Sequence, residues 1–179
     1  VILTGTTATA KDLKELATKT SKTIDASGIE TITGNAADVK TVLAADGIDT
    51  NANVAVTVTG TVSAADANTI TGATTGTVTA TVAAGTAAAL NKALVNANGT
   101  LVTGDNLTLT ISKGTAAAAD LIALDGKTSL AVDASLVTTI TGSAADVKTV
   151  LAAAGIDTAT DVAVTVSDTT VSVADANII

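Results

Sequence analysis

Residues 32–45 read ITGNAADVKTVLAA, and residues 140–153 read ITGSAADVKTVLAA. Carried on to residue 59, this match with the segment 108 positions later comprises 22 identities in 28 positions. The same offset relates scattered residues between 12 and 27 to those between 120 and 135. Internal repetition of this kind is typical of proteins built by stacking similar units. We therefore expect residues 1–179 to form one continuous repeat array with a superperiod of 108 residues.

A shorter motif inside the superperiod predicts the start of a helix. Ser, Thr or Asn is followed by two mostly small residues and usually by Asp, as in Asn35 to Asp38 and Ser143 to Asp146. The cap oxygen accepts from the free N–H groups of the first turn, while the acid can reach back to the N–H of the cap residue. The acid also meets the positive end of the helix dipole. Such starts lie near residues 9, 35, 63, 86, 115, 143 and 172, which gives units of about 23 to 29 residues.

Apolar residues after these starts fall three and four apart, as in Val39, Val42 and Leu43, which is the stripe of a short helix. A second example is the series Leu90, Leu94 and Val95. Glycines follow where a left-handed residue commonly ends a helix. They are Gly47, Gly99, Gly126 and Gly155.

The pattern then changes to an alternation of branched apolar residues with small or polar ones, which is typical of half-buried strands. It occupies residues 54–59, 77–82, 107–111, 130–134 and 162–166. Each unit is therefore predicted to be one helix and one strand. Alternating strands and helices form parallel strands with right-handed crossovers, and similar units continue one sheet.

These features predict an α/β fold, and more narrowly a single-faced α/β solenoid with a parallel sheet. The doubly wound nucleotide-binding fold is the alternative, but it covers both sheet faces and needs strands that are apolar on both sides. Here one strand face is mostly Thr and Ala. No polar capping unit is visible at either end, so we expect a segment of a longer array or a piece that stacks end to end.

The composition excludes much chemistry. The chain uses eleven residue types and contains no His, Cys, Met, Pro, Arg, Gln or aromatic residue. The usual metal ligands, an imidazole base and a thiol nucleophile are therefore missing. The net charge of -8 argues against nucleic-acid binding, and no apolar run approaches the length of a membrane span, so membrane insertion is not expected either.

Outward-facing threonines on the strands form the main candidate binding surface. Neighbouring parallel strands would align them in Thr-x-Thr rows about 4.8 Å apart. Such a face suits ice, a glycan or another ordered surface, although Asp25, Ala131 and Asp133 interrupt it and Thr is also a common exposed strand residue. The residues are Thr57, Thr59, Thr79, Thr81, Thr108, Thr110 and Thr165.

The repeated acids have two interpretations. Helix capping is favoured for the acids that recur one unit apart, which are Asp12, Asp38, Asp66, Asp146 and Asp175. Weak calcium binding is the alternative for acids placed in loops, because oxygen ligands suit that ion. Those acids are Asp46, Asp49, Asp105, Asp157 and Asp161.

No catalytic residue is predicted, and the chain is not expected to be an enzyme. Ser beside Lys is the only nucleophile arrangement available, and the pairs at 21–22 and 112–113 would point to opposite faces of a strand. The Gly-rich stretch 71–76 lacks the Lys and helix of a phosphate-binding loop.

Residues 36–43, 155–166 and 170–177 resemble the Ala-, Thr- and Asp-rich tandem repeats of very large secreted or cell-surface proteins of marine bacteria, especially cyanobacteria. The resemblance implies a structural or adhesive role outside the cell and carries no catalytic residues. We accordingly expect an extracellular structural protein that associates with itself end to end or laterally. Surface binding through the threonine face is the alternative function.

Overall fold

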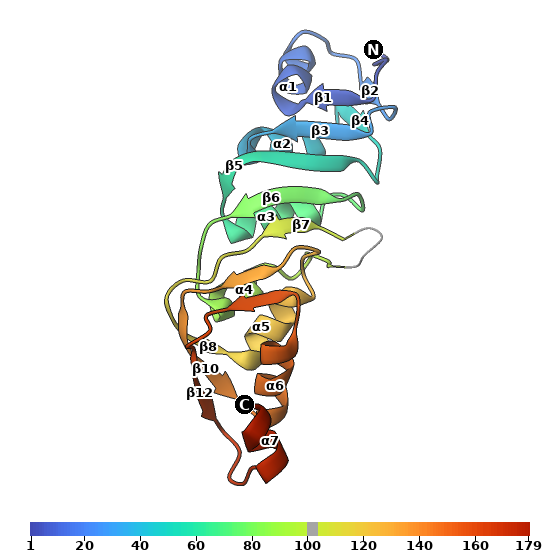
Figure 1. The fold of residues 1–179 in the computed structure, drawn as a ribbon. Coiled ribbons are helices and arrows are strands. Elements are labelled where there is room, and N and C mark those ends of the chain that lie inside the picture. The colour runs from blue at the N-terminus through green and yellow to red at the C-terminus, as the bar shows by residue number, and fades with distance from the viewer. Residues whose placement is uncertain (100–103) are drawn as a thin grey trace.

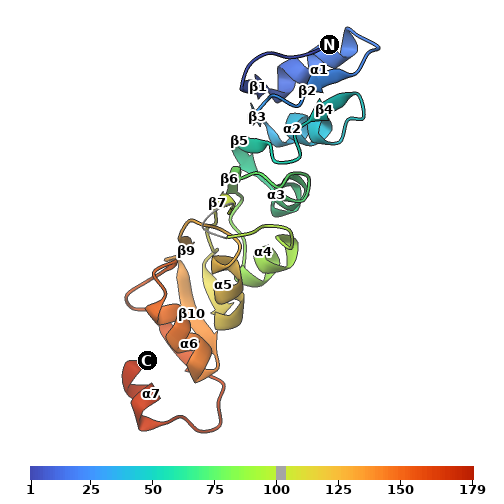
Figure 2. The same ribbon diagram turned by 90° about the vertical axis from the view of Figure 1, so that its right-hand side faces the viewer.

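A computed structural model describes residues 1–99 and 104–179. The chain is an α/β protein whose described part contains seven helices and only parallel strand pairs, which confirms the predicted class. Figure 1 shows an elongated molecule with the two termini near opposite ends. Figure 2 shows helices α1 to α4 along one side of the strands.

The helices are short and follow one another along the molecule, each in contact with the next. Their bounds are α1 (Ala10–Thr18), α2 (Ala36–Leu43), α3 (Ala64–Thr71), α4 (Ala87–Ala93), α5 (Ala118–Asp125), α6 (Ala144–Ala152) and α7 (Val173–Ile178).

The strands form four sheets: two long rows, meaning the sheets of five and three strands, and two short rows, meaning the two sheets of two strands. The first long row has the order β1-β3-β5-β6-β7 and the second β12-β10-β8, while the short rows are β2-β4 and β11-β9. The strands of the first half are β1 (Thr7–Thr9), β2 (Ile24–Ala26), β3 (Thr31–Gly34), β4 (Ile48–Thr50), β5 (Ala55–Val62) and β6 (Val78–Val82). The rest are β7 (Asn106–Thr108), β8 (Gly114–Ala117), β9 (Val132–Ala134), β10 (Val137–Gly142), β11 (Ile156–Thr158) and β12 (Ala163–Val166).

The strand register repeats at a constant step in most of the molecule. Ala8 lies opposite Ile32, and Ile32 lies opposite Val56, so each partner is 24 residues further along the chain. The same step relates Ile24 to Ile48 in the short row and Ile140 to Val164 in the second half. Equal steps mean that successive units present the same face to their neighbours.

The prediction of one sheet is wrong, because residues 106–111 pair with different rows on their two sides. Residues of β7 pair with β6, and Gly85 forms a bridge with Ile111. On the other side Thr110 forms a bridge with Asp133 in the short strand β9. The long row of the first half therefore continues into the short row of the second half, and β8 begins a new long row.

The prediction of one strand per unit is also wrong. Most units contain a short strand of the type Ile-Asp-Ala before the long strand, and both kinds line the core. The strand predicted at residues 130–134 is the short strand β9, whereas β2, β4 and β11 were missed because three residues show no alternation, yet the tripeptide itself recurs. It reads IDA at residue 24, IDT at 48, VDA at 132 and IDT at 156.

The core lies between the strands and the helices and consists of Ile, Val, Leu and Ala. Small side chains let the layers approach closely, since the chain has no aromatic residue to separate them. Val39, Val42, Leu90 and Leu94 are buried as their spacing predicts, whereas Val95 lies beyond its helix and is 67% exposed.

None of the four predicted glycines is left-handed, although Gly126 does end α5, in the right-handed conformation with φ of -71°. Among described residues, only Gly5, Gly60, Gly114 and Gly142 have positive φ. Gly99 is instead required for close approach, because a Cβ there would lie 2.7 Å from the backbone oxygen of Thr128. Gly60, with φ of 77°, lies in a break of register between β5 and β6.

Candidate functional surface

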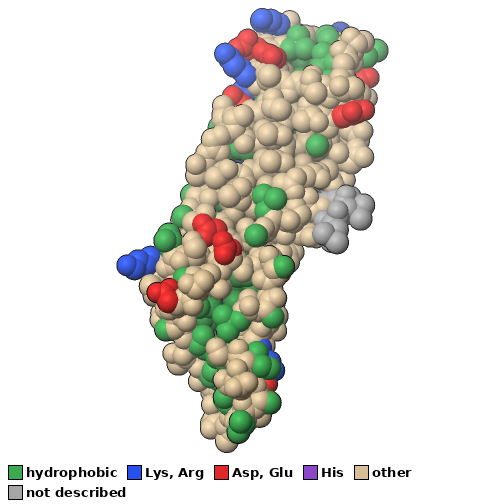
Figure 3. Space-filling model, in the orientation of Figure 1, with side chains coloured by type: hydrophobic (Ala, Val, Ile, Leu, Met, Phe, Trp, Pro, Cys, Tyr) green, Lys and Arg blue, Asp and Glu red, His purple; other side chains and the backbone are tan. Residues whose placement is uncertain are grey.

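The outward face of the first long row carries threonines in register. Thr9, Thr33, Thr57 and Thr79 are successive partners across β1, β3, β5 and β6. A second line joins Thr61 to Thr81 and Thr81 to Thr108. Figure 3 shows that the middle of this face is largely uncharged.

The other predicted threonines are placed differently. Thr59 is exposed but lies in the register break of β5, without a paired residue on β6. Thr110 is half-buried opposite Asp133, and Thr165 lies next to Thr141 in the second long row. Five of the seven candidates thus share one row, namely Thr57, Thr59, Thr79, Thr81 and Thr108.

Asp25 does not interrupt that face, contrary to the expectation from sequence. It belongs to the short strand β2, where it lies opposite Asp49 of β4 and accepts hydrogen bonds from the N–H and hydroxyl of Ser27. These bonds hold the pKa of Asp25 below its usual value, with the Ser27 hydroxyl as the largest cause. Asp25 and Asp49 therefore lie in a separate strand row from the threonine face, whereas Asp133 forms a bridge with Thr110 at the end of that face.

The helix starts are confirmed at six of the predicted caps. In each, the cap side chain accepts from the N–H three residues later, as Asn35 does from Asp38 at 2.9 Å. The other five caps are Thr9, Ser63, Thr86, Ser143 and Ser172. The start predicted near 115 is displaced, because α5 begins at Ala118 and its cap, Ala117, has no side-chain hydrogen bond.

The acid of each helix start was expected to accept from the backbone N–H of the cap residue, but the bond that forms is a different one. The carboxylate of Asp66 accepts from the Ser63 hydroxyl at 2.9 Å rather than from the backbone N–H of the cap. Asp146 and Asp175 accept from their cap serines in the same way. The acid thereby fixes the cap hydroxyl, which in turn accepts from the helix N–H.

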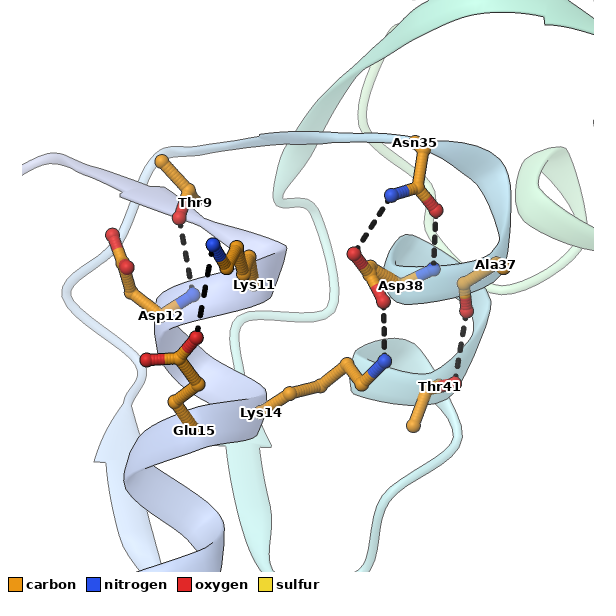
Figure 4. A network of polar contacts seen from close by, with 9 residues as sticks. All are labelled: Thr9, Lys11, Asp12, Lys14, Glu15, Asn35, Ala37, Asp38 and Thr41. Carbon is orange, nitrogen blue, oxygen red and sulfur yellow. Dashed lines mark hydrogen bonds and ion pairs between the residues drawn. The ribbon is translucent and has the colours of Figure 1, made fainter.

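A series of rungs connects one helix to the next, and it was not found from sequence. A rung is a side-chain contact from the fifth residue of one helix to the third residue of the following helix. Lys14 donates to Asp38, as Figure 4 shows, and Lys40 donates to Asp66. Asn91 donates to Asp120 at 2.9 Å, and Lys148 donates to Asp175.

The rung acids are electrostatically stabilised as carboxylates. The Lys14 ammonium, followed by the Asn35 amide, lowers the pKa of Asp38 below its usual value. Lys40 and then the Ser63 hydroxyl do the same for the pKa of Asp66. Asp38, Asp66 and Asp175 therefore each serve their own helix cap and the preceding helix at once. The signal in the sequence was the Lys two residues after the capping Asp in the motif AADVK.

Asp105 is buried, and its carboxylate is bonded to the backbone. It is 5% exposed, and its carboxylate accepts from the N–H of Val78 and the N–H of Asn98, each at 3.0 Å. Burial is the largest effect on its pKa and raises it above the usual value. A neighbouring buried hydroxyl, on Thr128, donates to Leu107 O at 2.7 Å and accepts from Leu107 N–H at 3.0 Å.

Other residues considered for calcium lie on several elements. Asp49 and Asp157 lie in β4 and β11 rather than in loops, and Asp46 and Asp161 are exposed. Within residues 1–99 and 104–179, no three acidic side chains gather into a group suited to a metal ion. Calcium binding stays a prediction, and a calcium titration would test it.

The Ser and Lys neighbours lie outside strands, which corrects the expectation that a strand separates them. Ser21 and Lys22 are exposed in a bend before β2, and Ser112 and Lys113 connect residues 109–111 to β8. The stretch 71–76 joins α3 to β6, with Thr74 buried against Val54 O at 2.6 Å. None of the described helices is long and apolar enough to cross a bilayer.

The comparisons with known proteins found no relative. No protein-family model, curated protein or solved structure matches this chain significantly.

Proposed function

We propose that this chain is an extracellular structural repeat protein whose units form one solenoid over residues 1–179. The observation that carries the proposal is the 24-residue register that recurs in both halves, from Ala8 through Ile32 to Val56 and from Ala116 through Ile140 to Val164. Within each half, equal steps allow extension, because a unit offers its successor the surface that it received from its predecessor. An extended, self-associating assembly at a cell surface or in a matrix is the corresponding function.

The rungs support the same proposal. They join α1 to α2, α2 to α3, α4 to α5 and α6 to α7, each through one acid of the following helix, so they fix the spacing of these units without any long side chain in the core. The uncharged middle of the strand face is consistent with a scaffold. The resemblance to repeats of secreted bacterial proteins, carried by motifs such as residues 36–43, supports a location outside the cell.

Electron microscopy of the purified chain over a range of concentrations tests the proposal. Filaments or sheets are expected, with a repeat along the fibre that matches whole molecules. Small-angle scattering of the dilute monomer provides a second test, because a compact chain of this length would have a radius of gyration of about 16 Å. A value near that figure would contradict an extended scaffold.

Binding of an ordered surface by the threonine face is the second candidate. The in-register line Thr33, Thr57 and Thr79 favours it, because parallel strands place successive hydroxyls at the strand spacing of about 4.8 Å. Thermal hysteresis and ice shaping are the measurements. Thr79→Leu and Thr108→Leu should abolish either activity, whereas Thr69→Leu on the exposed side of α3 should not.

A further inference from the structure

The buried polar side chains of the protein gather around one cavity. The core is otherwise built of Ile, Val, Leu and Ala, and only four polar side chains are buried within residues 1–99 and 104–179. Three of the four line a cavity of about 230 Å³ in the middle of the chain. Polar groups that converge on a concave site are what orients a bound ligand. The three are Thr71, Thr74 and Asp105, which are 7%, 8% and 5% exposed.

The cavity lies at the joint between α3 and α4, where no rung forms among the described residues. Its walls come from the segment 71–76 that follows α3 and from residues that follow α4, among them Asn96 and Asp105. A rung needs Asp in the third position of the following helix, and α4 has Ala89 there. Asn68, in the fifth position of α3, accepts instead from the N–H of Asn96 at 2.7 Å. This joint therefore has no charged side-chain contact of the rung type.

The hydroxyl hydrogens that line the cavity are already used in bonds to the backbone. The hydroxyl of Thr71 donates to Asn68 O at 3.1 Å, and that of Thr75 donates to Ala52 O at 3.2 Å. The hydroxyl of Thr74 likewise donates to a backbone oxygen at 2.6 Å. Each hydroxyl has one hydrogen and two lone pairs. What these threonines can offer a ligand is therefore oxygen lone pairs, which suit a cation.

The carboxylate of Asp105 adds a negative charge to the same cavity. Its two oxygens accept from the N–H groups of Val78 and Asn98, each at 3.0 Å. A carboxylate has about four lone-pair positions, so further ones stay available to a ligand. None of the ion pairs among the described residues includes Asp105. An ionised group this deeply buried costs free energy unless an opposite charge compensates it, which a bound cation would do.

We propose that this cavity binds one calcium ion, with the Asp105 carboxylate as its charged ligand and the Thr75 hydroxyl oxygen as a neutral one. Calcium accepts mixed oxygen ligands and waters in flexible arrangements, whereas magnesium demands a near-ideal octahedron. With a single carboxylate the Kd should be about 10⁻⁴ to 10⁻³ M, at the weak end of calcium sites. The ion joins the segments that follow α3 and α4, and so takes the place of the missing rung.

Thermal unfolding of the whole chain, followed by circular dichroism, tests the site. Calcium is removed with a chelator and then added at constant ionic strength to about 10 mM, well above the expected Kd. The Tm should rise by at least about 3 °C, since an ion that binds only the folded chain stabilises it. Magnesium at the same concentration should have a smaller effect. A smaller rise with calcium, or an equal rise with magnesium, would overturn the proposal.

Two matched substitutions locate the ion. Asp105→Asn removes the charged ligand and should abolish the calcium-dependent rise in Tm, whatever it does to the stability of the calcium-free chain. Asp46→Asn removes the same charge from an exposed acid in the turn after α2, and the rise should then equal that of the parent chain. Equal rises in the two variants would show that calcium does not bind at Asp105.

Thr75→Val keeps the test decisive if the Asp105→Asn chain does not fold. Thr75 is exposed, so its replacement leaves the core intact while removing a hydroxyl oxygen from the cavity. Isothermal titration calorimetry with calcium chloride should find one ion per parent chain, and a Kd at least about threefold higher for Thr75→Val. An unchanged Kd, or no binding by the parent chain, would contradict the site. Dilute chains are used, so the result does not depend on whether the protein assembles.

Discussion

Helices α3 and α7 have closely related sequences in different surroundings. Residues 63–70 read SAADANTI and residues 172–179 read SVADANII. In α3 both Ala67 and Ile70 are fully buried, since β6 and α4 pack on the following side. In α7, which contacts α6 on one side, the equivalent Ala176 is exposed and Ile179 is only half-buried.

This difference shows that the core of a unit is completed by the unit that follows it. The local features of the two helices are alike, because Ser63 and Ser172 cap them and Asp66 and Asp175 accept a rung from the preceding helix. Only the packing on one side changes. Burial of apolar area is the main favourable term in folding, so stability should be concentrated in the interfaces between units.

Truncation of the equivalent isoleucines should have the largest and most unequal effect. Ile70→Ala should lower the free energy of unfolding by about 2 to 5 kcal/mol, because it leaves a cavity in a fully buried site. Ile179→Ala should cost less than about 1 kcal/mol, as for other partly exposed positions. Urea unfolding followed by circular dichroism measures both. Equal losses would mean that α3 gains nothing from the next unit.

Asp105 provides a second comparison, between a buried and an exposed acid. Asp105→Ala leaves the buried N–H of Val78 without its acceptor, which should cost about 1 to 3 kcal/mol. The control, Asp161→Ala in an exposed turn, should change stability by less than about 0.5 kcal/mol. The same urea titration compares them. A neutral Asp105→Ala would show that the carboxylate does not hold residues 78 and 98 together.

Cap residues and rung residues differ in how far the sequence predicts them. Helix starts such as Asn35 were found because capping depends on neighbours within three residues. The rung from Lys14 to Asp38 spans 24 residues, so it becomes visible only when one unit is laid on the next. The repeat revealed that units are alike, but not that residues 106–111 pair with a long row on one side and a short row on the other.

The burial of Asp105 likewise could not be predicted from the residues next to it in the sequence. It stands where Thr128 and Thr74 stand in other units, each hydroxyl or carboxylate bonding backbone groups at the start of a strand. An acid in a polar segment is most often exposed, so composition alone suggested a loop ligand. The signal in the sequence is its position before a strand, which it shares with two threonines. That position predicts a hydrogen bond to the backbone.

The contrast between α5 and α6 should produce a smaller effect. Ala117 has the extended cap conformation, with φ of -76° and ψ of 134°, but no oxygen to accept from the helix. Ala117→Ser should therefore stabilise the protein by about 0.5 to 1 kcal/mol, and Ser143→Ala should destabilise it by about 1 kcal/mol. Thermal unfolding by circular dichroism records the direction of each. A loss of stability in the Ala117→Ser chain would contradict the cap geometry.

The pH dependence sets the rung acids against Asp105. Bonds from Lys14 and Asn35 lower the folded-state pKa of Asp38, so its stabilising contribution is present above the ordinary value of 3.8 and is lost as pH falls through the lowered value. Burial raises the pKa of Asp105, so its contribution is greatest below 3.8 and declines as pH rises through the raised value.

Urea midpoints measured on both sides of pH 3.8 separate the two groups. Asp38→Asn should remove part of the loss of stability in acid, and Lys14→Ala should do the same because it removes the largest cause of the lowered pKa. Asp105→Asn should leave that acid limb unchanged and flatten the decline above pH 3.8. If Asp38→Asn and the parent chain lost stability in parallel below pH 3.8, the rung would not bind the ionised carboxylate in solution, and successive helices would be held by their apolar contacts alone.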